Sequence, residues 1–270
     1  MKGRIKFSKT GSMRFIGHLD VMRYFQKAFR RADIAVSYSQ GFSPHQLMSF
    51  ASPLGIGLSS DGEYLDVVLE DSVNTDTLVA VLNEQMNEEI RIKDFTVLSD
   101  EAKTSMAVLA ACDYLVTVKP DKSSFLTEVP DLKKVFEAFL SQEQITILKK
   151  TKRSEKLVDI KENIYCLTTE RSKFESFTKG SYETLSLDTK VYQPLFYCQL
   201  TAGSVINIKP ELIIEALAQY MDKEYSALDY QIHRLEMYAD TNAKKGEVHT
   251  RSSETPVQLL PLSVYEKRPS

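Results

Sequence analysis

Cysteine is scarce in this chain, and its few cysteines form no recognisable site. The three of them, Cys112, Cys166 and Cys198, lie far apart. An odd number at such wide spacing is a poor disulfide framework, and no pair has the CxxC spacing of a metal site. The chain also lacks the CxxxCxxC pattern that supplies three thiolates to an iron–sulfur cluster. We therefore expect buried thiols in a reducing compartment and no cofactor held by this chain.

Long apolar runs are missing too. A membrane-spanning helix needs about 20 consecutive apolar residues, and every apolar run here is much shorter. Residues 1–6 are partly basic but are not followed by the apolar core and cleavage site of a signal peptide. The 270 residues are 43% apolar and 26% charged, which is typical of a globular protein with room for two domains. We expect a soluble, cytoplasmic protein that makes no membrane contact.

Catalytic signatures are also lacking. No GxSxG, HExxH or Walker A pattern occurs, and Gly55-Ile56-Gly57 lacks the strand–GxGxxG–helix context of a dinucleotide loop. His18, Asp20 and His45 could form a metal or acid–base site, and an enzyme that uses them is one alternative. However, the helix dipole accounts for an acid near a helix start, and two separated histidines do not define a site. We assign no catalytic residue and no metal ligand.

The charge of the chain is distributed very unevenly along the sequence. The whole chain has a formal charge of −3. Residues 1–50 contain nine lysines and arginines but only two acidic residues, a formal charge of +7, so the remainder must sum to −10. The basic charge is concentrated at one end of the chain, which makes residues 1–50 the first place to look for a working surface.

The N-terminal part alternates strand and helix patterns. Period-two alternation predicts strands, and apolar residues at helical spacing predict helices, with Asn74 as the cap of the second one. The expected elements are strand 3–8, helix 18–33, strand 48–51, strand 63–69, helix 75–86 and strand 90–98. This β-α-β-β-α-β order predicts an α+β module of ferredoxin-like type over residues 1–104.

A second α+β module is expected over residues 111–240, with a ferredoxin-like arrangement as one option. Segment 99–110 reads as a linker whose second half is apolar enough to be helical. The module's expected elements are strands 113–119, 144–150, 195–202 and 230–238 and helices 132–140 and 210–221. Pro210 suits the first turn of the last helix. Residues 241–270 are mostly polar and charged, so we expect a largely disordered tail there.

Several cations are candidates for gripping phosphates. On the first helix, Arg23, Lys27, Arg30 and Arg31 are spaced to share one exposed stripe. Clustered cations attract a polyanion by releasing its counterions. The alternative is a helix face that is merely solvated. The further candidates are Arg4, Lys6 and Arg14 nearby and a second basic run at a hairpin end, Lys149, Lys150, Lys152 and Arg153.

The segment from Gln40 to His45 is a candidate binding loop. It combines a permissive glycine, an aromatic ring that could stack, and polar donors, so it could hold a base or a peptide. In the alternative interpretation, glycine and proline only shape the turn while Phe42 packs inward. The binding-loop candidates are Gln40, Gly41, Phe42, Ser43 and His45, with His18 and Asp20 at the start of the helix.

Five segments of the N-terminal part, taken in order, resemble a known family. They read RFIGHLD (14–20), FRRA (29–32), YSQGFSPH (38–45), SFASPL (49–54) and EYLD (63–66). In this order they resemble the radical-SAM-associated protein family, an uncharacterised bacterial family of unknown-function domains. The similarity is dense over residues 1–70, and VDI (158–160) and NIKPEL (207–212) look like later landmarks.

The resemblance implies a protein encoded beside, or fused behind, a radical SAM protein, often near a ribonuclease of the E/G type and ribosomal-protein genes. It therefore implies a radical SAM partner, which would carry the iron–sulfur cluster and S-adenosylmethionine, and RNA as a substrate. Our leading expectation is an accessory protein that holds RNA for such an enzyme or docks onto it. A protein–protein adaptor that binds no RNA is the main alternative.

Overall fold

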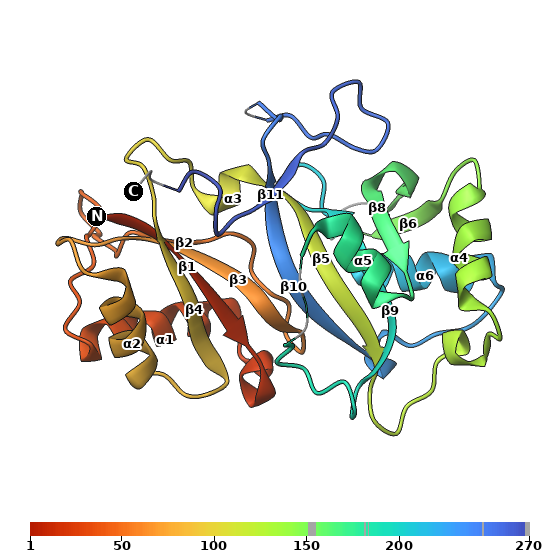
Figure 1. The fold of residues 1–270 in the computed structure, drawn as a ribbon, viewed down its shortest axis with the longest axis horizontal. Coiled ribbons are helices and arrows are strands. Elements are labelled where there is room, and N and C mark those ends of the chain that lie inside the picture. The colour runs from red at the N-terminus through yellow and green to blue at the C-terminus, as the bar shows by residue number, and fades with distance from the viewer. Residues whose placement is uncertain (151–154, 181, 183, 245, 268–270) are drawn as a thin grey trace. The chain divides into compact units, whose positions relative to one another are not determined.

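The computed structural model, drawn in Figure 1, describes residues 1–150, 155–180, 182, 184–244 and 246–267, and of Lys149 and Lys150 only the backbone. The chain forms two compact units. Unit 1 comprises Met1–Ala110, Glu236–Thr241 and Gln258–Ser270, and unit 2 comprises Ala111–Leu235 and Asn242–Val257. Both units combine helices with antiparallel strands, so the predicted α+β class is confirmed.

Unit 1 begins with the predicted order of elements. These are β1 (Lys2–Lys9), the 3-10 helix η1 (Gly11–Phe15), α1 (His18–Arg31), β2 (Met48–Phe50), β3 (Ser59–Val68), α2 (Thr75–Glu84) and β4 (Ile90–Val97). β1 pairs with both β3 and β4, and β2 pairs with β3, each time antiparallel. Asn74 caps α2 as expected, because its side chain accepts a hydrogen bond from the backbone N–H of Thr77.

One face of this sheet carries the core of unit 1. Ile5 of β1 lies opposite Leu65 of β3, and both belong to a buried cluster with Phe25 and Phe29 of α1. The helices α1 and α2 therefore cover this face, as Figure 1 shows. Phe7 of β1 packs edge-on against Phe25 of α1, with ring centroids 4.8 Å apart. This contact holds α1 against the strands.

Side chains alternate along a strand, so Arg4 and Asp66, which also lie opposite each other, point to the other face. Their ion pair has an Nε–Oδ1 distance of 2.7 Å and is buried. Arg4 also donates to the carbonyl oxygens of Leu262 and Tyr265, at 3.1 and 3.3 Å. The C-terminal segment of unit 1 thus covers part of the face that α1 and α2 leave open.

This covering segment differs from the disordered tail expected over residues 241–270. Strand β11 (Leu259–Pro261) pairs with the part of β10 (Tyr230–Asp240) that belongs to unit 1. Leu262 is fully buried, and Thr96 donates to the carbonyl oxygen of Ser263 at 2.7 Å. The short apolar run 257–262, set in a polar context, makes these contacts. Unit 1 is consequently discontinuous in sequence, unlike the continuous module 1–104 that we expected.

Unit 2 contains the elements that periodicity predicted and several that it did not. Its helices are η2 (Phe125–Glu128), α4 (Leu132–Ser141), η3 (Lys161–Asn163), α5 (Arg171–Thr178), α6 (Pro210–Tyr220) and η4 (Ala227–Asp229). Its strands are β6 (Thr146–Lys150), β7 (Glu155–Asp159), β8 (Ile164–Thr168), β9 (Gln193–Thr201), all but the first two residues of β5 (Leu109–Val118), and residues 230–235 of β10. The missed ones, β7, β8 and α5, are short. The helical turn α3 (Ser105–Val108) fits the expectation for segment 99–110.

The three cysteines are free thiols of unit 2, in line with the sequence. Cys112 and Cys198 are buried, and Cys166 is half-buried. Desolvation is the main factor that raises the pKa of Cys166 to about 12, and the Asp113 carboxylate adds to it. Since the pKa of this thiol lies far above neutral pH, it stays protonated and unreactive there. Within the described residues, no helix has the length and apolarity needed to cross a membrane.

Candidate functional site

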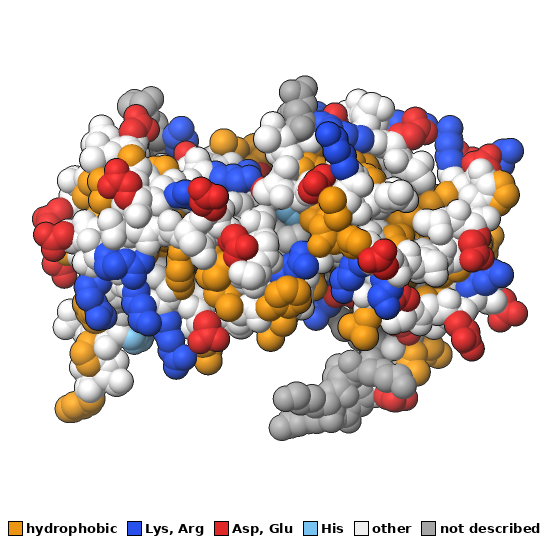
Figure 2. All heavy atoms as spheres, turned by 90° about the horizontal axis from the view of Figure 1, so that it is seen from below, with side chains coloured by type: hydrophobic (Ala, Val, Ile, Leu, Met, Phe, Trp, Pro, Cys, Tyr) orange, Lys and Arg blue, Asp and Glu red, His pale blue; other side chains and the backbone are white. Residues whose placement is uncertain are grey.

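The basic stripe of α1, comprising Arg23, Lys27, Arg30 and Arg31, is exposed as predicted. The helix buries Val21, Phe25, Ala28 and Phe29 against the sheet, and its opposite side carries the cations. Figure 2 shows Lys and Arg side chains gathered on unit 1, at the left of that view. The four cations of the stripe are thus exposed together on the side of α1 that faces away from the sheet.

Two members of the stripe are held in place by neighbours. Arg23 contacts Asp20 at 3.3 Å, but both side chains are more than half exposed, so water screens this pair strongly. Arg31 donates to the carbonyl oxygen of Gln85 at 2.5 Å. Among the described residues, no hydrogen-bond or ion-pair partner is found for the side chains of Lys27 and Arg30. These two cations are therefore the most available ones.

The binding loop runs from Ser39 to His45 and is closed by hydrogen bonds at its stem. The backbone N–H of Ser39 donates to the carbonyl oxygen of His45 at 2.8 Å, and the N–H of His45 donates to the Ser39 hydroxyl at 3.1 Å. Gly41 has a φ of 116°, which residues with a side chain rarely adopt. Phe42 has a relative exposure of 112%, so the interpretation in which it packs inward is wrong.

A groove adjoins the stem of this loop. Its volume is about 220 Å³, below the roughly 300–1,000 Å³ that is usual for pockets of drug-sized ligands, so it has room for a smaller group. Its lining comes from β1, the loop, β2, β3 and the residue before α3, namely Lys2, His45, Leu47, Met48, Ser49, Asp66, Val67, Val68 and Thr104. Ser49 lies opposite Asp66 in the sheet, so the groove opens on the face away from α1.

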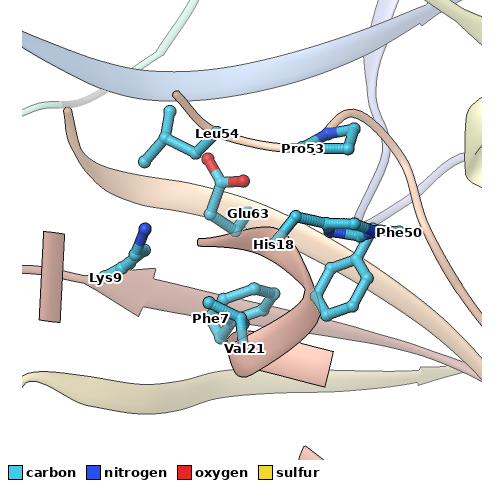
Figure 3. A pocket seen from close by; sticks show the side chains of 8 residues that line it. All are labelled: Phe7, Lys9, His18, Val21, Phe50, Pro53, Leu54 and Glu63. Atoms are coloured by element: carbon cyan, nitrogen blue, oxygen red, sulfur yellow. The ribbon is translucent and has the colours of Figure 1, made fainter. Parts of the chain in front are cut away.

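A second, smaller hollow lies beside the start of α1 (Figure 3). The side chains of Lys9, His18 and Glu63, from β1, α1 and β3, border it together with Phe50. Lys9 is buried and donates to the carbonyl oxygen of Ile16 at 2.9 Å, which ties down the turn before the helix. At about 10 Å³ this hollow has room for one water molecule at most, so we assign it a structural role.

The enzyme alternative required His18, Asp20 and His45 to share a cleft, and they do not. His18 packs edge-on against Phe50, with ring centroids 5.1 Å apart, and borders the small hollow. His45 borders the groove, where its Nδ1 lies 2.9 Å from the Ser39 hydroxyl. Asp20 is exposed beside Arg23. In the described part of the chain, no group of three or more His, Cys, Asp or Glu residues is arranged to hold a metal ion.

Three residues that were predicted to bind phosphate make contacts within unit 1. Arg4 is buried in its ion pair with Asp66, so its assignment as a phosphate ligand is wrong. Lys6 is paired with Glu236 at 2.6 Å and is mostly buried. Arg14 stacks its guanidinium 4.8 Å from the ring centroid of Phe15. The sequence does not show which face of strand β1 is covered, so Arg4 and Lys6 could not be distinguished from exposed cations.

Of the second basic run, the structure describes only the backbone of Lys149 and Lys150. Lys149 and Lys150 end strand β6, which pairs with β7 in the predicted hairpin. Their side chains, together with Lys152 and Arg153, lie outside the described residues. The prediction of a phosphate grip at this hairpin therefore stays a prediction.

The groove is the feature that sequence reasoning missed. Lys2, Ser49 and Thr104 belong to three separate segments, and none of them stands in a pattern that indicates a site. The strand period was a usable signal, because Lys2, Arg4 and Lys6 occupy every second position of β1 and therefore share one face. That period cannot reveal which end of the face stays uncovered.

Comparison with known proteins identifies a family for the chain. No curated protein matches the chain. A family model described as "Uncharacterized protein conserved in bacteria (DUF2344)" matches residues 2–210, which include all of α1, the binding loop, the groove lining and most of unit 2. The chain therefore belongs to the bacterial family DUF2344.

Proposed function

We propose that unit 1 is a ferredoxin-like binding module that holds RNA for a separate radical SAM enzyme in the cytoplasm and docks onto that enzyme. The chain itself supplies no catalytic group, and the partner carries the iron–sulfur cluster and S-adenosylmethionine. The element order and the neighbour relations β4-β1-β3-β2 support the ferredoxin-like assignment. The observation that carries the proposal is the exposed stripe, in which Lys27 and Arg30 are free to contact phosphates.

The stripe suits a nucleic-acid backbone on physical grounds. Its cations lie along one helix side and follow one another at three- and four-residue spacing, so they can contact successive phosphates. The guanidinium of Arg30 can bind a phosphate through two hydrogen bonds, and Lys27 adds a point charge. Release of counterions from the phosphates then favours binding and makes the affinity depend on salt.

The binding loop adds an interaction that does not depend on charge. A fully exposed phenylalanine at the tip of a loop with a closed stem loses little freedom when a base stacks on it. Base–aromatic stacking contributes about 1–3 kcal/mol per base and tolerates any sequence. The stripe and Phe42 together therefore favour binding of RNA that has unpaired bases.

The RNA part of the proposal is tested by filter binding with structured RNA at low salt. Replacing both Lys27 and Arg30 with alanine should weaken binding about tenfold or more, because two charge-assisted interactions with phosphates are removed. The matched control is Lys190→Ala with Lys223→Ala, which removes the same charge from exposed positions in unit 2 and should leave the affinity unchanged. Equal affinities for the stripe variant and the wild type would contradict the proposal.

The docking part is supported by exposed apolar side chains at the start of α1. Phe15, Leu19 and Ile56 have relative exposures of 59%, 66% and 68%. The N–H of Gly57 donates to the carbonyl oxygen of Arg14 at 2.8 Å, which joins the loop of Ile56 to the turn of Phe15. Exposed apolar groups clustered in this way favour a protein contact. The same cluster favours the alternative of an adaptor that binds no RNA.

Anaerobic co-purification with the radical SAM protein tests this docking. The wild-type chain should co-elute with the enzyme, and Leu19→Asp with Ile56→Asp should abolish co-elution, because burying two carboxylates in an apolar interface is strongly unfavourable. Val205→Asp with Leu228→Asp places the same charges at exposed apolar positions of unit 2 and should have no effect. Failure of the wild type to co-elute would refute the docking proposal, whereas docking without RNA binding would select the adaptor.

A further inference from the structure

The groove beside the binding loop lies on a part of its sheet face that the described residues of unit 1 leave uncovered. Elsewhere on this face, Arg4 reaches the carbonyl oxygens of Leu262 and Lys103, so that the C-terminal segment and the residues before α3 cover it. At the β2 end, Leu47 and Val68 remain as an apolar wall. A surface of this size is open to a ligand, because no described segment of unit 1 fills it.

Polar groups are set around this apolar wall at defined places. Among the described residues, no hydrogen-bond partner is found for the hydroxyls of Ser49 and Thr104, which both border the groove. The ammonium group of Lys2 donates to the carbonyl oxygen of Ala102 and so stays at the edge of the groove. Asp66 is held by Arg4 and by the N–H of Ser105, at 2.7 and 2.5 Å. A ligand therefore meets free hydroxyls and one cation beside an apolar wall, with a carboxylate whose charge is already compensated.

One aromatic ring borders the groove, and a second belongs to the same loop. The ring of His45 borders it and is oriented by the Ser39 hydroxyl, which accepts from the His45 backbone and can donate to Nδ1. In that tautomer Nε2 carries the proton and acts as a donor. Three residues earlier, Phe42 offers an uncovered ring face. A flat, apolar molecule with hydrogen-bonding edges fits this combination of groups.

We infer that the groove is a subsite for one unpaired nucleobase of the RNA, which stacks beside the binding loop while its edge bonds to Ser49 and Thr104. The inference rests on the proposed function, since it names the part of the RNA, an unpaired base, that the same unit recognises. A phosphate would leave the apolar wall of Leu47 and Val68 unused, and a base has both the flat faces and the polar edges that the groove matches. The subsite makes the protein prefer single-stranded over paired RNA.

The test compares a short single-stranded RNA that contains a fluorescent purine analogue with a fully paired, blunt-ended RNA duplex of the same length. Thr104→Trp fills the groove from an exposed position, so it does not disturb the core. The substitution should weaken binding of the single strand by roughly five- to 150-fold, the range expected when one base no longer stacks. It should also abolish the change in fluorescence that the purine analogue shows on binding. Binding of the duplex should be unaffected. Met106→Trp adds the same ring at an exposed neighbour outside the groove and should behave as the wild type.

The outcomes separate this inference from the proposal on which it rests. If Thr104→Trp binds the single strand as tightly as the wild type, the subsite is wrong, while the dependence on Lys27 and Arg30 still stands. If Thr104→Trp weakens docking of the enzyme but not RNA binding, the groove holds a protein segment and the inference is overturned. If the wild type binds neither RNA, the proposed function and the subsite fall together.

Discussion

Replacing Arg4 with alanine should lower the free energy of unfolding by about 3–5 kcal/mol, because the carboxylate of Asp66 would remain buried without its counter-charge. The Arg4 side chain has no exposed surface and that of Asp66 only 6%. The substitution also removes the hydrogen bonds to Leu262 and Tyr265 that hold the C-terminal segment. Urea unfolding followed by circular dichroism measures the change.

Arg23→Ala is the matched control for this prediction. It breaks an ion pair with Asp20 whose side chains are 68% and 60% exposed, so the free energy of unfolding should change by less than about 1 kcal/mol. The two substitutions remove the same chemical group from the two faces of unit 1. If Arg4→Ala were no more destabilising than Arg23→Ala, the buried position of Arg4 would be wrong, and Arg4 would have to be regarded as a surface cation.

Leu262→Ala should lower the free energy of unfolding by about 2–5 kcal/mol, the range for truncating a fully buried leucine. Its backbone N–H donates to the carbonyl oxygen of Met237 at 3.0 Å, which anchors the residue beside β10. The size of this effect reports whether the C-terminal segment is part of the core of unit 1. Thermal and urea unfolding of the variant provide the measurement.

Val264 supplies the comparison for Leu262, since it lies two residues further along and is 46% exposed. Val264→Ala should change the free energy of unfolding by no more than about 0.5 kcal/mol. Two equally small effects would show that the segment is a disordered tail, as its polar composition indicates. A large effect confined to Leu262 would establish that residues 258–267 cover the sheet.

Helices and strands with a regular pattern could be predicted from the sequence because their signals are local. The burial of Phe25 and Phe29 and the exposure of Lys27 follow from the helical period alone. Asn74 and Pro210 marked helix starts through their own backbone chemistry. The strands β7 and β8 and the helix α5 were missed because so few residues give no clear period.

The environment of Arg4 could not be predicted, because it depends on interactions between residues far apart in sequence. Its partner Asp66 lies 62 positions away and the carbonyl of Leu262 lies 258 positions away. The strand period says that Arg4 and Lys6 share a face, but not that a distant segment covers it. The same limit explains why the tail was expected to be disordered.

The candidate site was predictable in part. The stripe on α1 followed from helical spacing, whereas the two interpretations of Phe42 could only be separated by its exposure in the folded chain. The groove brings together Lys2, Ser49 and Thr104, which become neighbours only through the pairing of β1, β2 and β3 and the hydrogen bond from the N–H of Ser105 to Asp66. Sites built from several segments of this kind have no local signature.

The salt dependence of RNA affinity tests the central claim most directly. For a binder that neutralises phosphates, the logarithm of the affinity falls linearly with the logarithm of the salt concentration, and removing one cation–phosphate interaction lowers the slope by about one unit. We predict a steep slope for the wild type and a slope smaller by about two units for Lys27→Ala with Arg30→Ala. An affinity that does not respond to salt, or an identical slope for the variant, would contradict the assignment of the stripe as an RNA-binding surface.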